Sequence, residues 1–102
     1  MKITPKIGAV DSQHPQADLI DTAVRILERG GVIAFPTGSL YGLGADALNA
    51  GAVDRVFAIK MRALYKPLLI LVPDRKVVFD LAAEVPPAAK RLMDRFWPGQ
   101  VT

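Results

Sequence analysis

The sequence predicts an α/β fold, in which a single twisted, mostly buried sheet carries helices on its faces. Segments with helical spacing of apolar residues alternate with short segments that are apolar throughout, a pattern typical of a sheet covered on both sides. The composition agrees with a globular fold, because 51% of the 102 residues are hydrophobic and 23% are charged. A chain of this length forms one domain or part of one.

An N-terminal arm and a helix open the chain. Residues 2–10 read as a short strand or an extended arm, interrupted at Pro5. Residues 12–31 follow with a helical pattern, and Gly30-Gly31 predicts its end because glycine accepts the left-handed conformation found there. The apolar residues at helical spacing are Leu19, Ile20, Ala23, Val24 and Leu27.

A strand and a second helix come next. Residues 31–37, GVIAFPT, form a short continuous apolar run of the kind found in strands covered on both faces. Residues 49–62 predict a helix that Asn49 can cap at its N-terminus. The apolar face of this helix consists of Ala52, Val53, Val56 and Phe57.

The last third of the chain predicts one more strand and two more helices. Residues 67–74, PLLILVPD, are fully apolar up to a closing Pro-Asp pair. Residues 75–84 and 86–99 have helical patterns, and the second begins with a Pro-Pro pair and stops at a Pro-Gly pair. Val101 then reads as the start of a further strand, so the domain is expected to be cut short.

Composition narrows the possible functions. The chain has no cysteine, which excludes disulfides and thiolate metal sites, and its one histidine argues against a zinc site built by the protein. No apolar run reaches the length of a membrane span and no signal peptide is evident, so a cytoplasmic protein without membrane association is expected. The net charge of +3 permits binding of polyanions without requiring it.

Polar side chains follow the first predicted strand, where ligands of α/β sheets bind. Thr37, Ser39 and Tyr41 alternate in sequence, so an extended segment would point their hydroxyls to one side. Gly42 and Gly44 would let the backbone approach a ligand closely. A tight turn capped by a threonine is the structural alternative.

A basic segment follows the second helix. Residues 60–76 contain five basic side chains and one acidic one. Pro67 disfavours helix at Lys66, so the helix is expected to end near Lys60. A loop would then present Lys60 and Arg62 beside the next strand, a suitable arrangement for phosphate or carboxylate. A solvated basic loop without a ligand is the alternative.

Together these segments resemble the YrdC/Sua5 family of threonylcarbamoyl-adenylate synthases. The stretch GGVIAFPTGSLYGLGADALN is similar to the family pattern P-T-[DE]-T-V-Y-G-L-G, and KMRALYKPL is similar to K-x-R-x-x-[KN]-P-L, with one additional residue before Lys66. The ending FWPGQVT resembles W-P-G-P-L-T. The resemblance covers residues 15–102 and is strongest over 30–102, which implies that the chain is the N-terminal part of one YrdC-like domain.

The resemblance implies an enzyme, a nucleotidyltransferase that makes threonylcarbamoyl-AMP from L-threonine, bicarbonate and ATP and releases pyrophosphate. Its product supplies the t6A modification of tRNA. Mg²⁺ is expected to accompany ATP, with no metal site built by the protein. RNA, double-stranded RNA in some members, and proteins of the t6A pathway are further partners that the resemblance suggests.

The resemblance also assigns residues. Ser39 matches a threonine that contacts the substrate threonine, and its neighbours Thr37 and Tyr41 fall on the same side of the cavity. The residues that the resemblance assigns to ATP binding are Lys60, Arg62, Lys66 and Thr102. No residue is assigned as catalytic.

The sequence departs from the family pattern at several places. Gly38-Ser39 replaces Asp/Glu-Thr, Leu71 stands where some members have a histidine near the substrate, and Gln100-Val101 replaces Pro-Leu. The later S-x-N motif has no counterpart, so the chain by itself is expected to be incomplete as an enzyme. Two alternatives are a non-catalytic module that binds double-stranded RNA and the YrdC-like domain of a carbamoyl-transfer enzyme.

Overall fold

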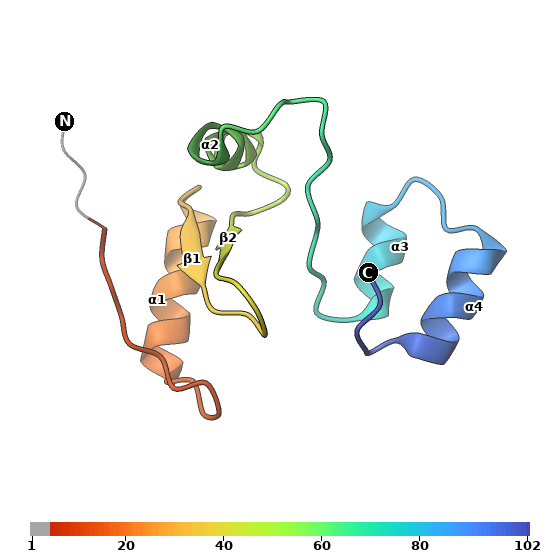
Figure 1. Ribbon diagram of the computed structural model, residues 1–102, viewed down its shortest axis with the longest axis horizontal. Helices are drawn as coiled ribbons and strands as arrows, with labels where there is room; N and C mark the ends of the chain where they lie inside the picture. The colour runs from red at the N-terminus through yellow and green to blue at the C-terminus, as the bar shows by residue number, and fades with distance from the viewer. Residues whose placement is uncertain (1–4) are drawn as a thin grey trace. The chain divides into compact units, whose positions relative to one another are not determined.

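The computed structural model describes residues 5–102, which divide into two compact units (Figure 1). The first unit ends at Pro67 and contains α1 (Ala17–Glu28), β1 (Ile33–Phe35), β2 (Gly42–Gly44) and α2 (Ala50–Lys60). The second unit is Leu68–Thr102 and contains α3 (Arg75–Leu81) and α4 (Pro87–Phe96).

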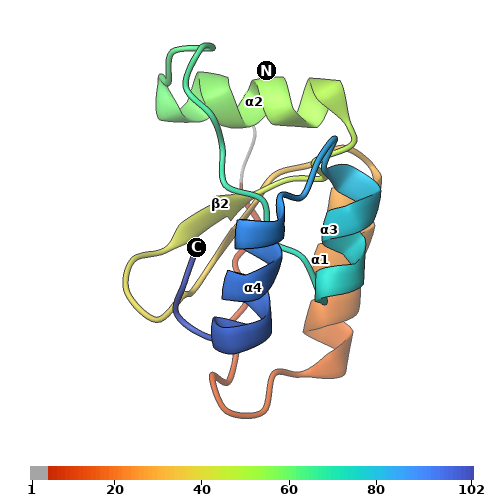
Figure 2. The ribbon, with the colours of Figure 1, turned by 90° about the vertical axis from the view of Figure 1, so that its right-hand side faces the viewer.

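The sheet of the first unit is an antiparallel hairpin of β1 and β2. Ala34 pairs with Leu43 at its centre, and Phe35 pairs with Gly42 next to the connecting loop. Along β1, Ile33 and Phe35 are half-buried whereas Ala34 is exposed, so the strand has one protected face. The helix α1 runs alongside β1, and α2 lies across one end of the hairpin (Figures 1 and 2).

The turn at Gly30 joins the three parts of the first unit. Gly30 is buried and left-handed, with a φ of 78°. The backbone N–H groups of Gly30 and Gly31 donate to the carbonyls of Leu27 and Ile26, which is the Schellman pattern that ends α1. Arg55 of α2 donates to the Gly30 carbonyl at 3.1 Å. The turn therefore ends α1, leads into β1 and holds α2.

Both ends of α2 follow local rules. The side chain of Asn49 accepts a hydrogen bond from the backbone N–H of Ala52 at 3.1 Å, as its predicted capping role requires. The helix ends at Lys60, and Met61 turns the chain with a φ of 51°. Between these ends, Ala52 and Val56 are the buried residues of α2.

The second unit pairs α3 with α4 (Figure 1). An ion pair of 2.5 Å joins Arg75 to Asp94, and the ammonium of Lys90 lies 5.7 Å from the centre of the Phe79 ring. Met93 on α4 is buried, with 6% of its surface exposed. One ion pair and one cation–π contact therefore join these two helices.

The α/β class and all four predicted helices are confirmed, with the sheet smaller than expected. The arm predicted at residues 2–10 forms neither helix nor strand over residues 5–10, and its first three residues lie outside the described part. The strand β2 was not predicted. Its sequence, Gly-Leu-Gly, lacks the β-branched and aromatic residues that normally mark a strand.

The predicted strand at residues 67–74 is wrong, as is the strand start at Val101. The first of these segments crosses from one unit to the other without helix or strand, and Leu69 and Leu71 are 69% and 73% exposed. A strand exists only where a neighbouring strand pairs with its N–H and C=O groups. The apolar composition identified a segment suited to burial, but it supplied no pairing partner among residues 5–102.

None of the helices in residues 5–102 has the length and apolar character that crossing a membrane requires.

Replacing Gly30 with alanine is expected to lower the free energy of unfolding by about 1–2 kcal/mol, the cost of a left-handed φ for an L-residue. The added Cβ would also lie 3.0 Å from the Asn49 amide nitrogen. Gly51→Ala is the matched control, because a Cβ there meets only the Asn49 Oδ1 at 3.5 Å, and should stabilise α2 by about 0.5–1 kcal/mol. Denaturant unfolding measures both, and equal effects of the two substitutions would contradict the role of Gly30.

Candidate functional site

The hydroxyl of Thr37 organises the loop between β1 and β2. It donates a hydrogen bond to the carbonyl of Leu40 and accepts one of 3.1 Å from the backbone N–H of Ser39. Threonine makes such local bonds in turns. The hydroxyl proton of Thr37 is therefore used in a hydrogen bond within the loop. This agrees with the alternative that the sequence left open, a tight turn capped by a threonine.

Ser39 and Tyr41 project from the loop that Thr37 shapes. Both residues are exposed, Tyr41 by 79%. Within residues 5–102, the Ser39 hydroxyl makes no hydrogen bond, so it can both donate to a ligand and accept from one. The loop thus offers one unengaged hydroxyl and one exposed aromatic side chain with a polar tip.

The two glycines of β2 lie against the ring of Phe35. A Cβ added to Gly42 would come within 3.0 Å of the Phe35 Cζ, and one added to Gly44 within 2.9 Å of its Cε1. Side chains at these positions would push the ring off the hairpin. The glycines therefore make room for Phe35 on this face, where the sequence had suggested room for a ligand.

The basic segment begins where α2 ends. Lys60 is the last helical residue, as predicted, and the left-handed Met61 separates it from Arg62. The chain is therefore neither helical nor extended across this pair, and it does not lie beside a strand as the sequence suggested. Lys60 and Lys66 are exposed.

Arg62 is the most constrained basic side chain of this loop. Its Nη2 donates a hydrogen bond of 2.8 Å to the carbonyl of Pro67. Its Nε is buried and has no hydrogen-bond partner within the described residues. Nη1 also has no hydrogen bond there, but it is not buried. Inside the loop that this bond closes, the backbone N–H of Lys66 donates to the Ala63 carbonyl at 3.0 Å.

The five basic residues of the segment are divided between the two units. Arg75 and Lys76 belong to the second unit, where Arg75 pairs with Asp94. Asp74, the acidic residue among them, caps α3 by accepting from the backbone N–H groups of Lys76 and Val77 at 2.9 and 3.3 Å. In the first unit, therefore, three cations lie at or after the end of α2.

Thr102 lies in a groove of the second unit with a volume of about 680 Å³. Leu71 lines the same groove, which is largely apolar. The indole N–H of Trp97 donates to the Val101 carbonyl at 2.8 Å and so holds the last residues in a turn. Of the residues that the resemblance assigned to ATP, Thr102 is the one that lies in this unit.

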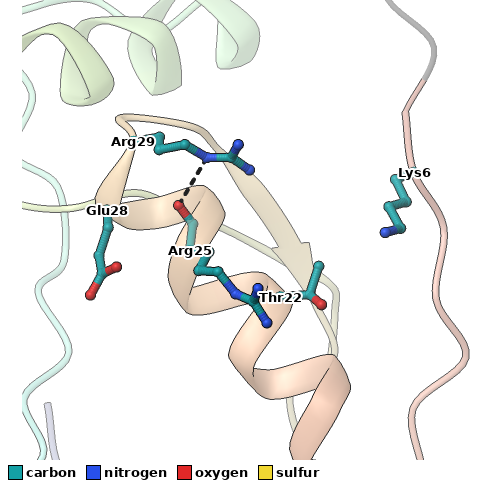
Figure 3. Close-up of a pocket in the computed structure, with 5 residues that line it drawn as sticks. All are labelled: Lys6, Thr22, Arg25, Glu28 and Arg29. Carbon is teal, nitrogen blue, oxygen red and sulfur yellow. Dashed lines mark hydrogen bonds between the residues drawn. The ribbon is translucent and has the colours of Figure 1, made fainter.

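A hollow of about 380 Å³ beside α1 was not predicted (Figure 3). The sequence did contain a signal for this hollow, because the spacing of Thr22, Arg25 and Arg29 places these polar side chains on one face of the helix. The Arg29 Nε donates to the Arg25 carbonyl at 3.3 Å, which holds this side chain along the helix. The hollow contains none of the predicted site residues, and its lining is Lys6, Thr22, Arg25, Glu28 and Arg29.

The structure thus gathers the predicted residues into three places. Thr37, Ser39 and Tyr41 share the hairpin loop, and the three lysine and arginine residues at 60–66 lie at the end of α2 and in the loop after it. Thr102 belongs to the second unit. Among residues 5–102, no group of three or more histidine, aspartate or glutamate side chains is placed to hold a metal ion.

Comparison with known proteins identifies relatives of this chain. A family model described as "Telomere recombination", covering Sua5, YciO and YrdC, matches residues 25–102. The chain is 38% identical over 100 residues to the threonylcarbamoyl-AMP synthase of Bacillus subtilis, which covers 98% of this chain and 27% of that protein. It is 42% identical over 83 residues to the Pyrococcus abyssi enzyme of the same name, which covers 81% of this chain and 24% of that one.

A solved structure agrees with these relationships. The crystal structure of Pyrococcus abyssi Sua5 complexed with L-threonine matches with a TM-score of 0.78 at 40% identity, over 84% of this chain and 25% of that one. The chain therefore spans about a quarter of the length of these relatives.

Replacing Thr37 with valine is expected to loosen the hairpin loop, because valine keeps the shape of the side chain and removes the hydroxyl. Amide hydrogen exchange at Ser39 should become about fivefold faster, the equivalent of one lost hydrogen bond of ~1 kcal/mol. Thr37→Ser retains the hydroxyl and should leave this rate close to that of the original chain. Equal rates in the valine and serine variants would show that the Thr37 hydroxyl does not order the loop.

Proposed function

This chain belongs to the Sua5/YciO/YrdC family, and we propose that it forms part of a threonylcarbamoyl-AMP synthase. The reaction joins L-threonine, bicarbonate and ATP into threonylcarbamoyl-AMP and releases pyrophosphate. The observation that carries the proposal is the likeness of 84% of this chain, at 40% identity, to a Sua5 protein whose crystal structure contains L-threonine. Relatives named threonylcarbamoyl-AMP synthase in other organisms support the same activity.

We assign the hairpin loop to L-threonine. Ser39 offers a hydroxyl that makes no hydrogen bond within residues 5–102, and Tyr41 stands exposed beside it. Thr37 acts by holding the loop, since its hydroxyl proton is given to the Leu40 carbonyl. The threonine ligand carries an ammonium, a carboxylate and a hydroxyl, each of which can hydrogen-bond to a serine or tyrosine hydroxyl.

We assign ATP to the basic residues after α2. Lys60, Arg62 and Lys66 supply three positive charges in a short stretch, and charge-assisted hydrogen bonds from such groups suit phosphate oxygens. Thr102, in the second unit, is assigned to ATP from the family resemblance alone. Mg²⁺ would arrive with the phosphates as part of the substrate, and we assign no residue of residues 5–102 as its ligand.

The role in the cell follows from the product. Threonylcarbamoyl-AMP would supply the t6A modification of tRNA, so proteins of that pathway and RNA are the proposed partners, and the cytoplasm is the proposed location. A non-catalytic RNA-binding module or a carbamoyl-transfer domain would have no need of L-threonine. Dependence on L-threonine therefore separates the proposal from both.

A chimera tests the proposal and takes account of the length of the chain. In the Bacillus subtilis relative, the matching segment of 100 residues is exchanged for this chain. The chimera should release pyrophosphate from ATP and bicarbonate only when L-threonine is present. A folded chimera that binds ATP but shows no response to L-threonine would overturn the assignment.

Replacing Ser39 with alanine should weaken L-threonine binding by about five- to tenfold, because one hydrogen bond of ~1 kcal/mol or slightly more is lost. ATP binding should stay within about twofold, since the hydroxyl is assigned to the amino-acid side. Calorimetric titration of the chimera with each ligand measures both affinities, with Ser39→Thr as the variant that keeps the hydroxyl. Equal losses for the two ligands would mean that the substitution damages the loop as a whole.

A further inference from the structure

Arg62 differs from the neighbouring lysines in where its donors point. Lys60 and Lys66 are exposed, and neither side chain forms a hydrogen bond or ion pair within the described residues. Arg62 is half-buried, and its Nη2 donates to the Pro67 carbonyl at 2.8 Å, five residues further along the chain. A hydrogen bond from a charged donor is stronger than one between neutral groups. The guanidinium therefore spans the base of the loop and closes it.

The loop that Arg62 closes has few other constraints. It starts at the left-handed Met61, a conformation that is unfavourable for a residue other than glycine. Inside it, one backbone hydrogen bond joins Lys66 to Ala63. No regular structure continues from the loop, since residues 61–74 contain neither helix nor strand. A single side chain thus has a large share in fixing the path of the loop.

The same contact fixes the orientation of the guanidinium. Nη2 is held by the Pro67 carbonyl, and Nε is buried and cannot turn toward water. Nη1 has no hydrogen bond within the described residues and is not buried. Because the guanidinium is planar and its donors have a fixed geometry, holding Nη2 and Nε determines where Nη1 points.

We infer that Arg62 is a positioning residue for its own loop. Its hydrogen bond to the Pro67 carbonyl closes residues 62–67, sets the direction of Nη1 and shapes the loop on which Lys66 lies before any ligand arrives. This inference deepens the ATP assignment and rests on the proposed function for the identity of the ligand. The hydrogen bond that closes the loop is present in the chain without ligand. The inference about Arg62 and the assignment of ATP can therefore be disproved separately.

Lysine cannot reproduce this arrangement. An ammonium keeps the positive charge, but it is a single compact donor group and cannot hold a carbonyl on one side while presenting a second nitrogen on the other. Arg62→Lys therefore removes the planar guanidinium that makes the closing contact and preserves the net charge. Lys60→Ala does the reverse, because it removes a charge from the proposed ATP site and leaves the Arg62–Pro67 contact intact.

Amide hydrogen exchange of the 102-residue chain without ligand tests the closing contact, read at the N–H of Lys66. Arg62→Ala and Arg62→Lys should each accelerate this exchange by about tenfold or more, as expected for one lost hydrogen bond from a charged donor. Lys60→Ala should leave it unchanged. Protection of the Ala52 amide, which Asn49 caps, serves as the control for global unfolding. Unchanged Lys66 exchange in Arg62→Ala, or an equal acceleration in Lys60→Ala, would overturn the inference.

Titration with tripolyphosphate, a probe for the phosphate chain of ATP, tests what the closing contact does for binding. If Arg62 positions the loop, Arg62→Lys should weaken tripolyphosphate binding by about threefold or more despite its unchanged charge, and Arg62→Ala should weaken it further. An affinity of Arg62→Lys equal to that of the original chain would show that charge alone matters. Failure of the original chain to bind tripolyphosphate would count against the ATP assignment, while the exchange result would still decide the closing contact.

Discussion

The first unit depends on one left-handed glycine. At Gly30 the backbone turns out of α1 toward β1. The carbonyl of Gly30 also accepts a hydrogen bond from the Arg55 guanidinium, so this one residue fixes both the direction of β1 and the position of α2. The side chain of Asn49 lies next to this turn and also caps α2. Few buried residues could compensate for its loss, since Ala52 and Val56 are the buried apolar side chains among residues 5–67. Hydrogen bonds to backbone groups therefore have an unusually large share in the architecture here.

The two segments that carry the proposed site follow a common physical rule. In each loop, one polar side chain is used to hold the backbone, namely Thr37 in the hairpin and Arg62 after α2. Their neighbours Ser39 and Lys66 are then presented to solvent from a loop whose path is already set. Such preorganisation lowers the ordering cost that binding would otherwise have to overcome. A motif can therefore need residues for the shape of its loops as well as for contact with a ligand.

Local sequence signals predicted the helices. The strands and the roles of the loop side chains depend on contacts between residues that the sequence pattern does not reveal. The Gly30-Gly31 stop and the Asn49 cap act on residues a few positions away, so the sequence was sufficient to find the C-terminal end of α1 and the N-terminal end of α2. The strand β2 forms by pairing with β1, and its glycines leave room for the Phe35 ring across the hairpin. The composition of Gly-Leu-Gly does not by itself indicate a strand. The segment at 67–74 has the composition of a strand, but strand formation requires a partner elsewhere in the chain. Likewise, the motif identified Thr37 and Ser39 together, and only the turn geometry separates the hydroxyl that holds the loop from the hydroxyl that stays open.

The packing of Phe35 on Gly42 and Gly44 has a spectroscopic consequence. Each glycine directs one of its Cα hydrogens toward the aromatic ring, along the line where a Cβ would come within about 3 Å of a ring carbon. Circulating π-electrons shift the proton resonances of nuclei this close to the ring. Two glycine Hα signals should therefore appear outside the ordinary glycine range in the proton spectrum of the folded chain, and their temperature dependence would follow the formation of the hairpin independently of both helices.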